Sequence, residues 1–396
     1  MNLKSKPFFD HHTHLLDPNM TVLTKKDYIM RFLHGFQDLD PWDKGADSAF
    51  SYGYASNWQI ENIANLGIVK VVTNYLADYL DCEPTIDAVL QKRNSSINGN
   101  VEKLKEYTKS LYNDANIIGT ILDTNDPWED QKSKVFPCPV FRLYNFEDDY
   151  FELLPVANSF NELITELYQR IKKAISDGFI ALKGHVAENY SMAIQKVCDK
   201  EAELKLAVVK KGNDKEAAKE VFFAMYRHIM VIAQELDVPL HIHAGTTGFN
   251  RPSARFVPNL DPFLFVPFLT SDFKFLKTKV IFLHQSYPYT RHAGIMAYSF
   301  PNIFVDTSWV LPWNALGFKT NIEDLLGVCP HDKIFFGSGQ HGFPEIAWTA
   351  AKVAKACLGD VLDDQIRMGL ISAKQAEKIV IQLLYQNAKE MYKLKI

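Results

Sequence analysis

The sequence predicts an α/β fold in which eight parallel strands close into a (β/α)8 TIM barrel. Short apolar runs recur along the chain, most are separated by segments of helical spacing, and a polar residue follows nearly every run. Alternating strands and helices predict a parallel sheet, and eight such strands predict a closed barrel with its active site at their carboxyl ends. The predicted strands are Pro7–Phe9, Ile117–Leu122, Val140–Leu143, Phe179–Leu182, Val238–Ile242, Val280–Leu283, Ile303–Val305 and Ile334–Phe336.

Two segments between the strands have apolar residues at the spacing of an amphipathic helix. One stripe extends from Phe222 to Leu236, and the other from Phe343 to Cys357. Pro344 suits the first turn of the second helix, where its missing N–H costs no hydrogen bond. We expect both stripes to pack against the barrel.

The chain has 396 residues, more than the roughly 250 of a typical barrel. We expect one barrel domain over residues 1–396 and place the excess in two regions. Residues 17–115 should form a mainly helical cap over the barrel mouth, because barrels keep specificity elements in their βα loops. Residues 196–220 are rich in both signs of charge, which is typical of a solvated helical excursion.

The composition of the chain limits the kinds of molecule that it is expected to bind. Lys and Arg total 43 and Asp and Glu total 47, for a net charge of −4, so no basic excess favours nucleic acid or an anionic membrane. No long apolar run or charged-then-apolar leader is present, and the five cysteines form no CxxC pair. We expect a cytoplasmic protein with reduced thiols and a small-molecule substrate, and leave open whether it forms a homo-oligomer.

The strongest local motif is His12-Thr13-His14 after the first predicted strand. Alternate residues of a strand point to the same side, about 6.6 Å apart, so both imidazoles can approach one cation. The alternative is that these histidines occur together by chance. Their place directly after a buried-strand entry favours the metal site.

Three further histidines end predicted strands. His241 and His243 flank Ile242, and we favour His243 as a metal ligand because it lies nearer the carboxyl end. For His241, a buried histidine that is hydrogen-bonded within the barrel is an equally good interpretation. His284 is expected to bind metal or act as an acid, with a buried structural histidine as the alternative. Asp306 takes a similar strand-end position.

Two cationic residues are candidates for substrate binding. Lys183 follows the fourth predicted strand, where it can pair with a substrate carboxylate or, if carbamylated, bridge two metals; a loop salt bridge is the alternative. Arg142 can bind a carboxylate through two hydrogen bonds, with a structural ion pair as its alternative. The sequence contains no phosphate-binding glycine loop and no GxSxG nucleophile elbow.

These residues together resemble the amidohydrolase superfamily, in particular its amidohydrolase-related (amidohydrolase 2, FluG-like) branch. The resemblance rests on His12-x-His14, His243, His284-Gln285-Ser286-Tyr287-Pro288 and the segment Lys333–Glu345, and it is densest from Pro239 to Trp348. It implies that His12, His14 and His243 bind a divalent metal, most often zinc, and that His284 assists. The implied activity is hydrolysis of a small organic acid or amide by a metal-activated water; nonoxidative decarboxylation is the alternative.

One position departs from the family pattern. The eighth strand of the family ends in an aspartate that ligates metal and takes a proton, whereas this chain has Gly339 there. Asp306, Gln340 or His341 would have to compensate; otherwise the chain is a catalytically impaired barrel that binds a ligand. We expect Gly339→Asp to tighten metal binding, unless the barrel has already reused that space.

Overall fold

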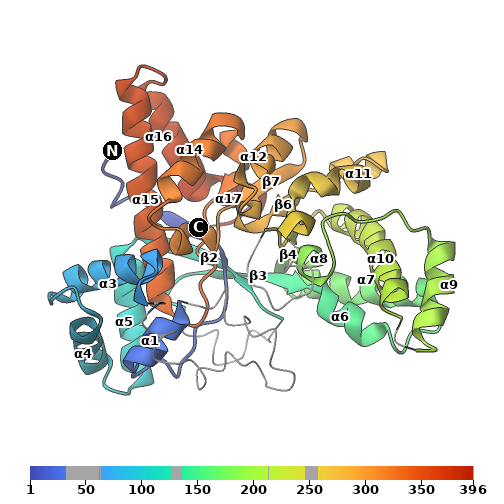
Figure 1. Cartoon of the computed structure of the whole chain (residues 1–396), viewed down its shortest axis with the longest axis horizontal. Helices are drawn as coiled ribbons and strands as arrows, with labels where there is room; N and C mark the ends of the chain where they lie inside the picture. The colour runs from blue at the N-terminus through green and yellow to red at the C-terminus, as the bar shows by residue number, and fades with distance from the viewer. Residues whose placement is uncertain (33–61, 63, 126–135, 213, 246–256, 396) are drawn as a thin grey trace.

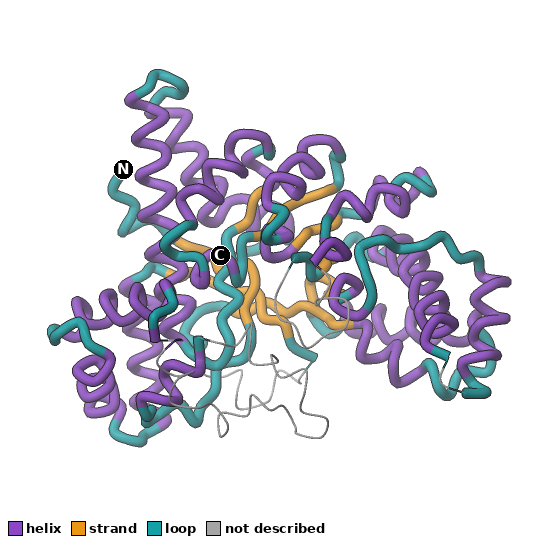
Figure 2. The backbone as a smooth tube through the Cα atoms, viewed as in Figure 1, coloured by secondary structure: helices purple, strands orange, loops and turns teal. Residues whose placement is uncertain are grey.

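The computed structural model describes residues 1–32, 62, 64–125, 136–212, 214–245 and 257–395. Within them, eight parallel strands pair in sequence order and helices surround them, so the predicted TIM barrel is confirmed (Figures 1 and 2). The strands are β1 (Phe8–Thr13), β2 (Ile117–Asp123), β3 (Val140–Asn145), β4 (Phe179–Gly184), β5 (Leu240–Ile242), β6 (Val280–Phe282), β7 (Ile303–Asp306) and β8 (Ile334–Phe335).

The barrel closes between its first and last strands. The backbone N–H of His11 donates to the carbonyl of Phe336 at 3.0 Å, and that of Gly339 donates to His12 at 2.7 Å. The N–H of His14 then donates to Gln340 at 2.8 Å. These bonds continue beyond the two residues of β8, so the segment that carries Gly339 is fixed to the end of β1.

Helices occupy the connections and the C-terminal region. The α-helices are α1 (Lys25–Arg31), α3 (Gly67–Leu80), α4 (Ile86–Ile97), α5 (Val101–Asp114), α6 (Phe146–Leu153), α7 (Phe160–Ser176), α8 (Val186–Asn189), α9 (Asp199–Val209), α10 (Lys215–Glu235), α11 (Val266–Leu269), α12 (Thr290–Ser299), α13 (Val310–Trp313), α14 (Phe318–Val328), α15 (Pro344–Arg367), α16 (Ala373–Ile381) and α17 (Asn387–Met391). None of the helices in these ranges is both long and apolar enough to cross a membrane.

Both helices predicted from apolar spacing are present. Helix α10 buries a face that extends from Ala217 to Ala233, and Asp214 caps its first turn by accepting from two backbone N–H groups. Helix α15 begins at Pro344, as the sequence indicated, and buries most of its first half. These faces supply much of the layer between the strands and the solvent.

The region predicted as a cap contains α1, α3, α4 and α5. Helix α5 packs against α15 and β2 and so belongs to the barrel wall, whereas α3 contacts α13, which follows β7. Residues 33–61 and 63 of the predicted cap lie outside the described residues, and the boundaries 17–115 stay a prediction. The charged excursion at 196–220 comprises α9 and the start of α10, with residue 213 outside the described part.

Candidate metal centre and active site

A β-bulge in β1 places two consecutive histidines inside the barrel. Asp10 pairs with Thr120 and Thr13 with Leu122, so β1 takes three steps where β2 takes two. A bulge of this kind changes the direction of the side chains that follow it. As a result, the consecutive residues His11 and His12 both contact histidines of other strands: the ring of His11 stacks on that of His241, and the ring of His12 meets that of His284 edge to face.

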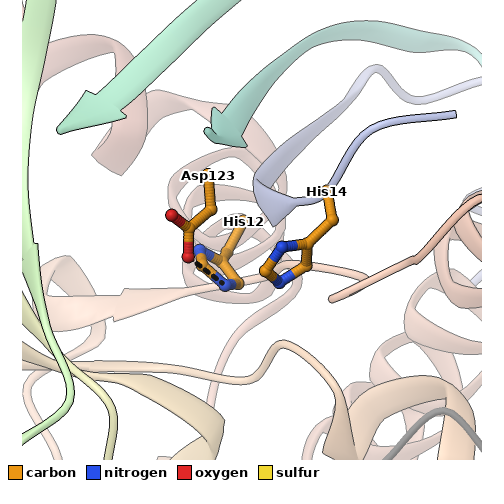
Figure 3. A group of neighbouring side chains, drawn as sticks. All are labelled: His12, His14 and Asp123. Carbon is orange, nitrogen blue, oxygen red and sulfur yellow. Dashed lines mark ion pairs between the residues drawn. The ribbon is translucent and has the colours of Figure 1, made fainter. Parts of the chain in front are cut away.

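His12, His14 and Asp123 form a set of potential metal ligands at the carboxyl ends of β1 and β2. One ligand atom from each residue lies within 4.8 Å of the other two (Figure 3). The rings of His12 and His14 meet edge to face, with centroids 5.1 Å apart, and His12 Nε2 lies 3.8 Å from Asp123 Oδ2. Two imidazoles and a carboxylate are a common donor set for a divalent metal.

The protonation states also suit a metal. Burial lowers the pKa of His12 well below its usual range, and the nearby Lys183 ammonium lowers it further, so the ring is neutral. Burial alone would raise the pKa of Asp123, but Lys183 and the neighbouring histidines lower it below its usual range, so the carboxylate is ionised. Both ring nitrogens of the fully buried His12 lack a hydrogen-bond partner, which fits a role of this residue in holding a cation.

Lys183 enters this centre from β4. Its Nζ donates to Asp123 Oδ2 at 2.7 Å and lies 3.0 Å from His185 Nε2. Glu147 holds His185 in turn, by accepting from its backbone N–H at 2.8 Å. The predicted site residue Lys183 therefore borders the metal centre, with 1 % of its side chain exposed.

His284 approaches the same centre from β6. Its ring centroid lies 5.7 Å from that of His12 and 4.4 Å from that of His243. His284 Nδ1 lies 2.9 Å from the carbonyl oxygen of Ser308, which can only accept, so Nδ1 carries the hydrogen and Nε2 is the basic nitrogen. Burial, followed by the neighbouring His243, lowers the pKa of His284 well below its usual range.

The turn that carries His284 is conformationally unusual. His284, Gln285 and Ser286 have φ values of 60°, 54° and 50°, three successive left-handed residues without a glycine. Such residues are costly singly and are concentrated at functional sites. Gly245 permits this turn, because a Cβ atom there would lie 2.5 Å from the backbone of Ser286.

The other predicted histidines lie at the edge of the centre. His243 Nε2 is 2.9 Å from Glu188 Oε1, and its ring contacts His284. Its place among the metal ligands stays a prediction, since the three-residue donor set found in the described part of the chain contains Asp123 instead. The ring of His341 stacks on that of His14, with centroids 3.5 Å apart.

Asp306 and Arg142 lie elsewhere. Asp306 Oδ2 is 2.8 Å from His11 Nδ1, and Asp306 Oδ1 accepts from the backbone N–H of Ser308. Arg142 stacks over Phe179 at 4.0 Å and donates to the carbonyl of Asp177, both at the start of β4. That start is the end of the barrel opposite the metal centre, so Arg142 is not brought to the site, and the catalytic role of Asp306 stays a prediction.

A buried network occupies the barrel interior beneath the centre. The Tyr392 hydroxyl lies 2.7 Å from His11 Nε2 and 2.6 Å from His241 Nε2, and the two imidazole rings stack with centroids 5.0 Å apart. Burial raises the pKa of Tyr392 well above its usual range and lowers that of His241 well below. His241 is therefore a bonded interior histidine, the alternative that the sequence left open.

Sequence reasoning missed Asp123 and Glu188. Asp123 had a recognisable signal, because it directly follows the apolar run Ile117–Leu122 at a strand end. Glu188 had none, since it lies in the short helix α8 and meets His243 only through the fold.

Part of the chain resembles a known protein family. Residues 203–394 match the model of the amidohydrolase family. A segment of 115 residues is 30 % identical to the protein fluG of Emericella nidulans; it spans 29 % of this chain and 13 % of the length of that protein.

Solved structures share the fold. A proposed metal-dependent hydrolase from Lactobacillus casei superimposes with a TM-score of 0.80 at 20 % identity, covering 100 % of this chain and 98 % of the other. Glucuronate isomerase from Caulobacter crescentus gives a TM-score of 0.66 at 15 % identity, covering 99 % and 92 %. The fold is thus shared at low identity, and the family match rests on the sequence itself. Residues 203–394 of the chain are assigned by their sequence to the amidohydrolase family.

Proposed function

We propose that the chain is a metal-dependent hydrolase of small organic acids or amides. The observation that carries this proposal is the donor set of His12, His14 and Asp123 beside the buried ammonium of Lys183. Zinc suits two imidazoles and a carboxylate, although the same donors serve iron in other proteins. When bound, a divalent metal would lower the pKa of a coordinated water and polarise a substrate oxygen.

Lys183 is the proposed anchor for the substrate. Its ammonium is buried beside the candidate ligands. A substrate that binds there would offer it an anionic or carbonyl oxygen. Arg142, the other cation expected to bind substrate, is at the opposite barrel end, so the anchor is left to Lys183.

His284 is the proposed proton acceptor. Because Ser308 fixes the hydrogen on Nδ1, the lone pair of Nε2 is available, and the depressed pKa keeps the ring neutral. This nitrogen would take the proton that the family aspartate takes elsewhere. His243, paired with Glu188, would then be placed to protonate a leaving group.

Gly339 supports a second candidate, a barrel that binds a ligand with little or no turnover. A glycine has no carboxylate to ligate metal or take a proton, and a general base typically contributes about 10²- to 10⁴-fold in rate. The two candidates differ in turnover, since both retain His12, His14 and Asp123.

Metal analysis is the first test. The metal-free chain would be loaded with zinc, manganese or ferrous iron and assayed for bound metal by mass spectrometry. We expect about one equivalent of metal, and a loss of affinity of about 100-fold or more in His12→Ala and Asp123→Asn, which exceeds the roughly 10- to 100-fold effect of losing a partner of a ligand. Asp148→Asn, which removes a nearby carboxylate outside the donor set, is the matched control. Equal affinity in all variants would refute the site.

Activity is the second test. The loaded chain would be screened against amides, lactones and carboxylic acids for hydrolysis and decarboxylation. Hydrolysis that disappears in His284→Ala while bound metal persists supports the hydrolase. Bound metal with no turnover on any compound supports the ligand-binding barrel, and carbon dioxide release would assign a decarboxylase instead.

A further inference from the structure

An apolar cavity is lined in part by Trp309, whose indole meets the ring of His284. Its volume is about 190 Å³, and its walls come from helix α3 and from the loops after β6 and β7. We call it the Trp309 cavity. Its lining consists of Leu66, Ile68, Tyr287, Trp309, Val310, Trp313 and Asn314. The lining side chains are mainly apolar; their polar groups are the amide of Asn314, the Tyr287 hydroxyl and the two indole N–H groups.

The cavity adjoins the chemistry through Trp309. The indole of Trp309 meets the ring of His284 at a centroid distance of 6.3 Å and an angle of 73°. His284 in turn contacts His12 of the donor set. A group bound in the cavity would therefore contact the indole that borders the residue proposed to take the proton.

The aromatic walls are held in fixed positions. The indoles of Trp309 and Trp313 stack at 23° with centroids 5.9 Å apart, and Trp313 Nε1 donates to the carbonyl of Phe32 at 2.6 Å. Two nearly parallel indoles give the cavity a flat aromatic side, which favours a flat ring as its occupant.

Trp309 also has a strained backbone. Its φ of 61° and ψ of −54° match the rare γ-turn, and the N–H of Val310 donates across it to the carbonyl of Ser308 at 2.7 Å. Strain of this kind persists where the surroundings enforce it, and it clusters at binding sites. A bulky residue with this positive φ raises the free energy of the folded chain, and the surrounding contacts hold it there.

Gly339 allows the backbone of Trp309 to lie close to the segment after β8. The Trp309 N–H donates to the carbonyl of Ser338 at 3.1 Å, and a Cβ atom on residue 339 would lie 2.5 Å from that same nitrogen. Any side chain at 339 would displace Trp309. The position of Trp309 therefore leaves no room for a carboxylate side chain at residue 339.

We propose that the Trp309 cavity binds an aryl group of the substrate, adjacent to the bond that is cleaved. The volume supports this size, because an engineered apolar cavity of about 150 Å³ binds benzene. The statement that the bound aryl group belongs to the substrate rests on the proposed function. Binding of an aryl group in the cavity can be tested without a metal.

The test uses the metal-free full chain and the neutral probe benzyl alcohol. Binding is followed by saturation-transfer NMR and by intrinsic tryptophan fluorescence, to which Trp309 and Trp313 contribute two of the six indoles. We expect saturable binding in the natural chain and a loss of about tenfold or more in Asn314→Phe, the scale of discrimination by a filled apolar pocket. Ile68→Trp is a second filling variant, in case the first fails to fold.

Leu370→Trp is the matched control, because it adds similar bulk at a residue that is 68 % exposed between α15 and α16. It should bind benzyl alcohol like the natural chain. No saturable binding, or equal binding in the control and both filling variants, would overturn the proposal.

These results are independent of the metal. Failure of metal binding overturns the proposed hydrolase and leaves a positive benzyl alcohol result in place, and the reverse also holds. If hydrolysis is found, Asn314→Phe should lower kcat/KM for N-benzoylglycine more than for N-acetylglycine at unchanged metal content. An equal loss for both substrates would refute the aryl assignment.

Discussion

Arg93 Nε donates to Glu345 Oε1 at 2.5 Å, and both side chains are fully buried. The pair joins helix α4, in the long connection after β1, to the first turn of α15 after β8. Arg93 also donates to the carbonyl of Met20 and lies over the rings of Tyr107 and Phe343 at 5.5 Å each. One guanidinium thus fixes the inserted helices to the barrel wall.

Replacing Arg93 with Met should be strongly destabilising, because it leaves the Glu345 carboxylate buried without a counter-charge. We expect a loss of about 3–5 kcal/mol in the free energy of unfolding, measured by urea denaturation. The double variant Arg93→Met/Glu345→Met should lose less than the sum of its single variants. Additive losses would show that the two residues do not act as a pair.

Gly339→Asp should destabilise the chain and fail to tighten metal binding. The residue has a φ of 60°, and a Cβ atom there meets the backbone of Trp309. Enforcing this conformation on a side chain costs about 1–3 kcal/mol. This prediction follows the alternative given in the sequence analysis, in which the barrel has already reused the space at Gly339. Zinc titration and thermal denaturation of the natural chain, Gly339→Asp and Gly339→Ala would decide; a stable aspartate variant with tighter metal binding would contradict it.

Lys183→Met should raise metal affinity while weakening substrate binding. The ammonium shares Asp123 Oδ2 with the candidate metal site, so its removal frees a carboxylate and removes a repelling charge. Lys92→Met, at an exposed position, is the matched control. Zinc titration measures the effect, and a lower affinity in Lys183→Met than in the control would contradict it.

Stability should depend on pH through Lys355. This buried lysine donates to the carbonyls of Ala115 and Lys4, and burial lowers its pKa to about 8. An unfolded lysine has a pKa of about 10.4, so between these values the unfolded chain binds more protons and stability rises with pH. Lys355→Met lacks this contribution, and the difference in unfolding free energy between it and the natural chain should grow in favour of the natural chain from pH 8 to about 10.4. Parallel stability curves would refute this.

Tyr392→Phe should destabilise the barrel interior. It removes the hydroxyl shared by His11 and His241 and leaves two buried imidazole nitrogens without that partner. A buried group left unpaired costs about 1–3 kcal/mol. Tyr298→Phe, at a residue that is 73 % exposed, should be neutral in the same denaturation experiment. Equal stability of the two variants would show that the network contributes nothing.

The barrel was predictable because its signals are local. Each strand is a short apolar run followed by a polar residue. Each of the helices α10 and α15 has apolar residues at helical spacing, a pattern that can be recognised within the helix sequence alone. The strand-end rule also brought His12, His14, Lys183 and His284 to one end of the barrel, since parallel strands present their carboxyl ends together.

The features that the sequence did not predict depend on contacts between residues far apart in the chain. The bulge in β1 decides the direction of His12, and it is visible only in the pairing with β2. Arg142 resembled a substrate anchor, but its place near the start of β3 directs it to Phe179 at the opposite barrel end. Asp123 gained its role only when β2 was placed beside β1, and Trp309 only when Gly339 was placed beside it.

Tyr392 has a consequence for the way this chain acquires its fold. Its hydroxyl reaches His11 across 381 residues of sequence and His241 across 151. During synthesis both histidines emerge from the ribosome long before their shared partner. A nascent chain that has completed all eight strands therefore still holds two interior imidazoles whose Nε2 atoms lack this partner, and the interior network is complete only after α17 and Tyr392 have been synthesised.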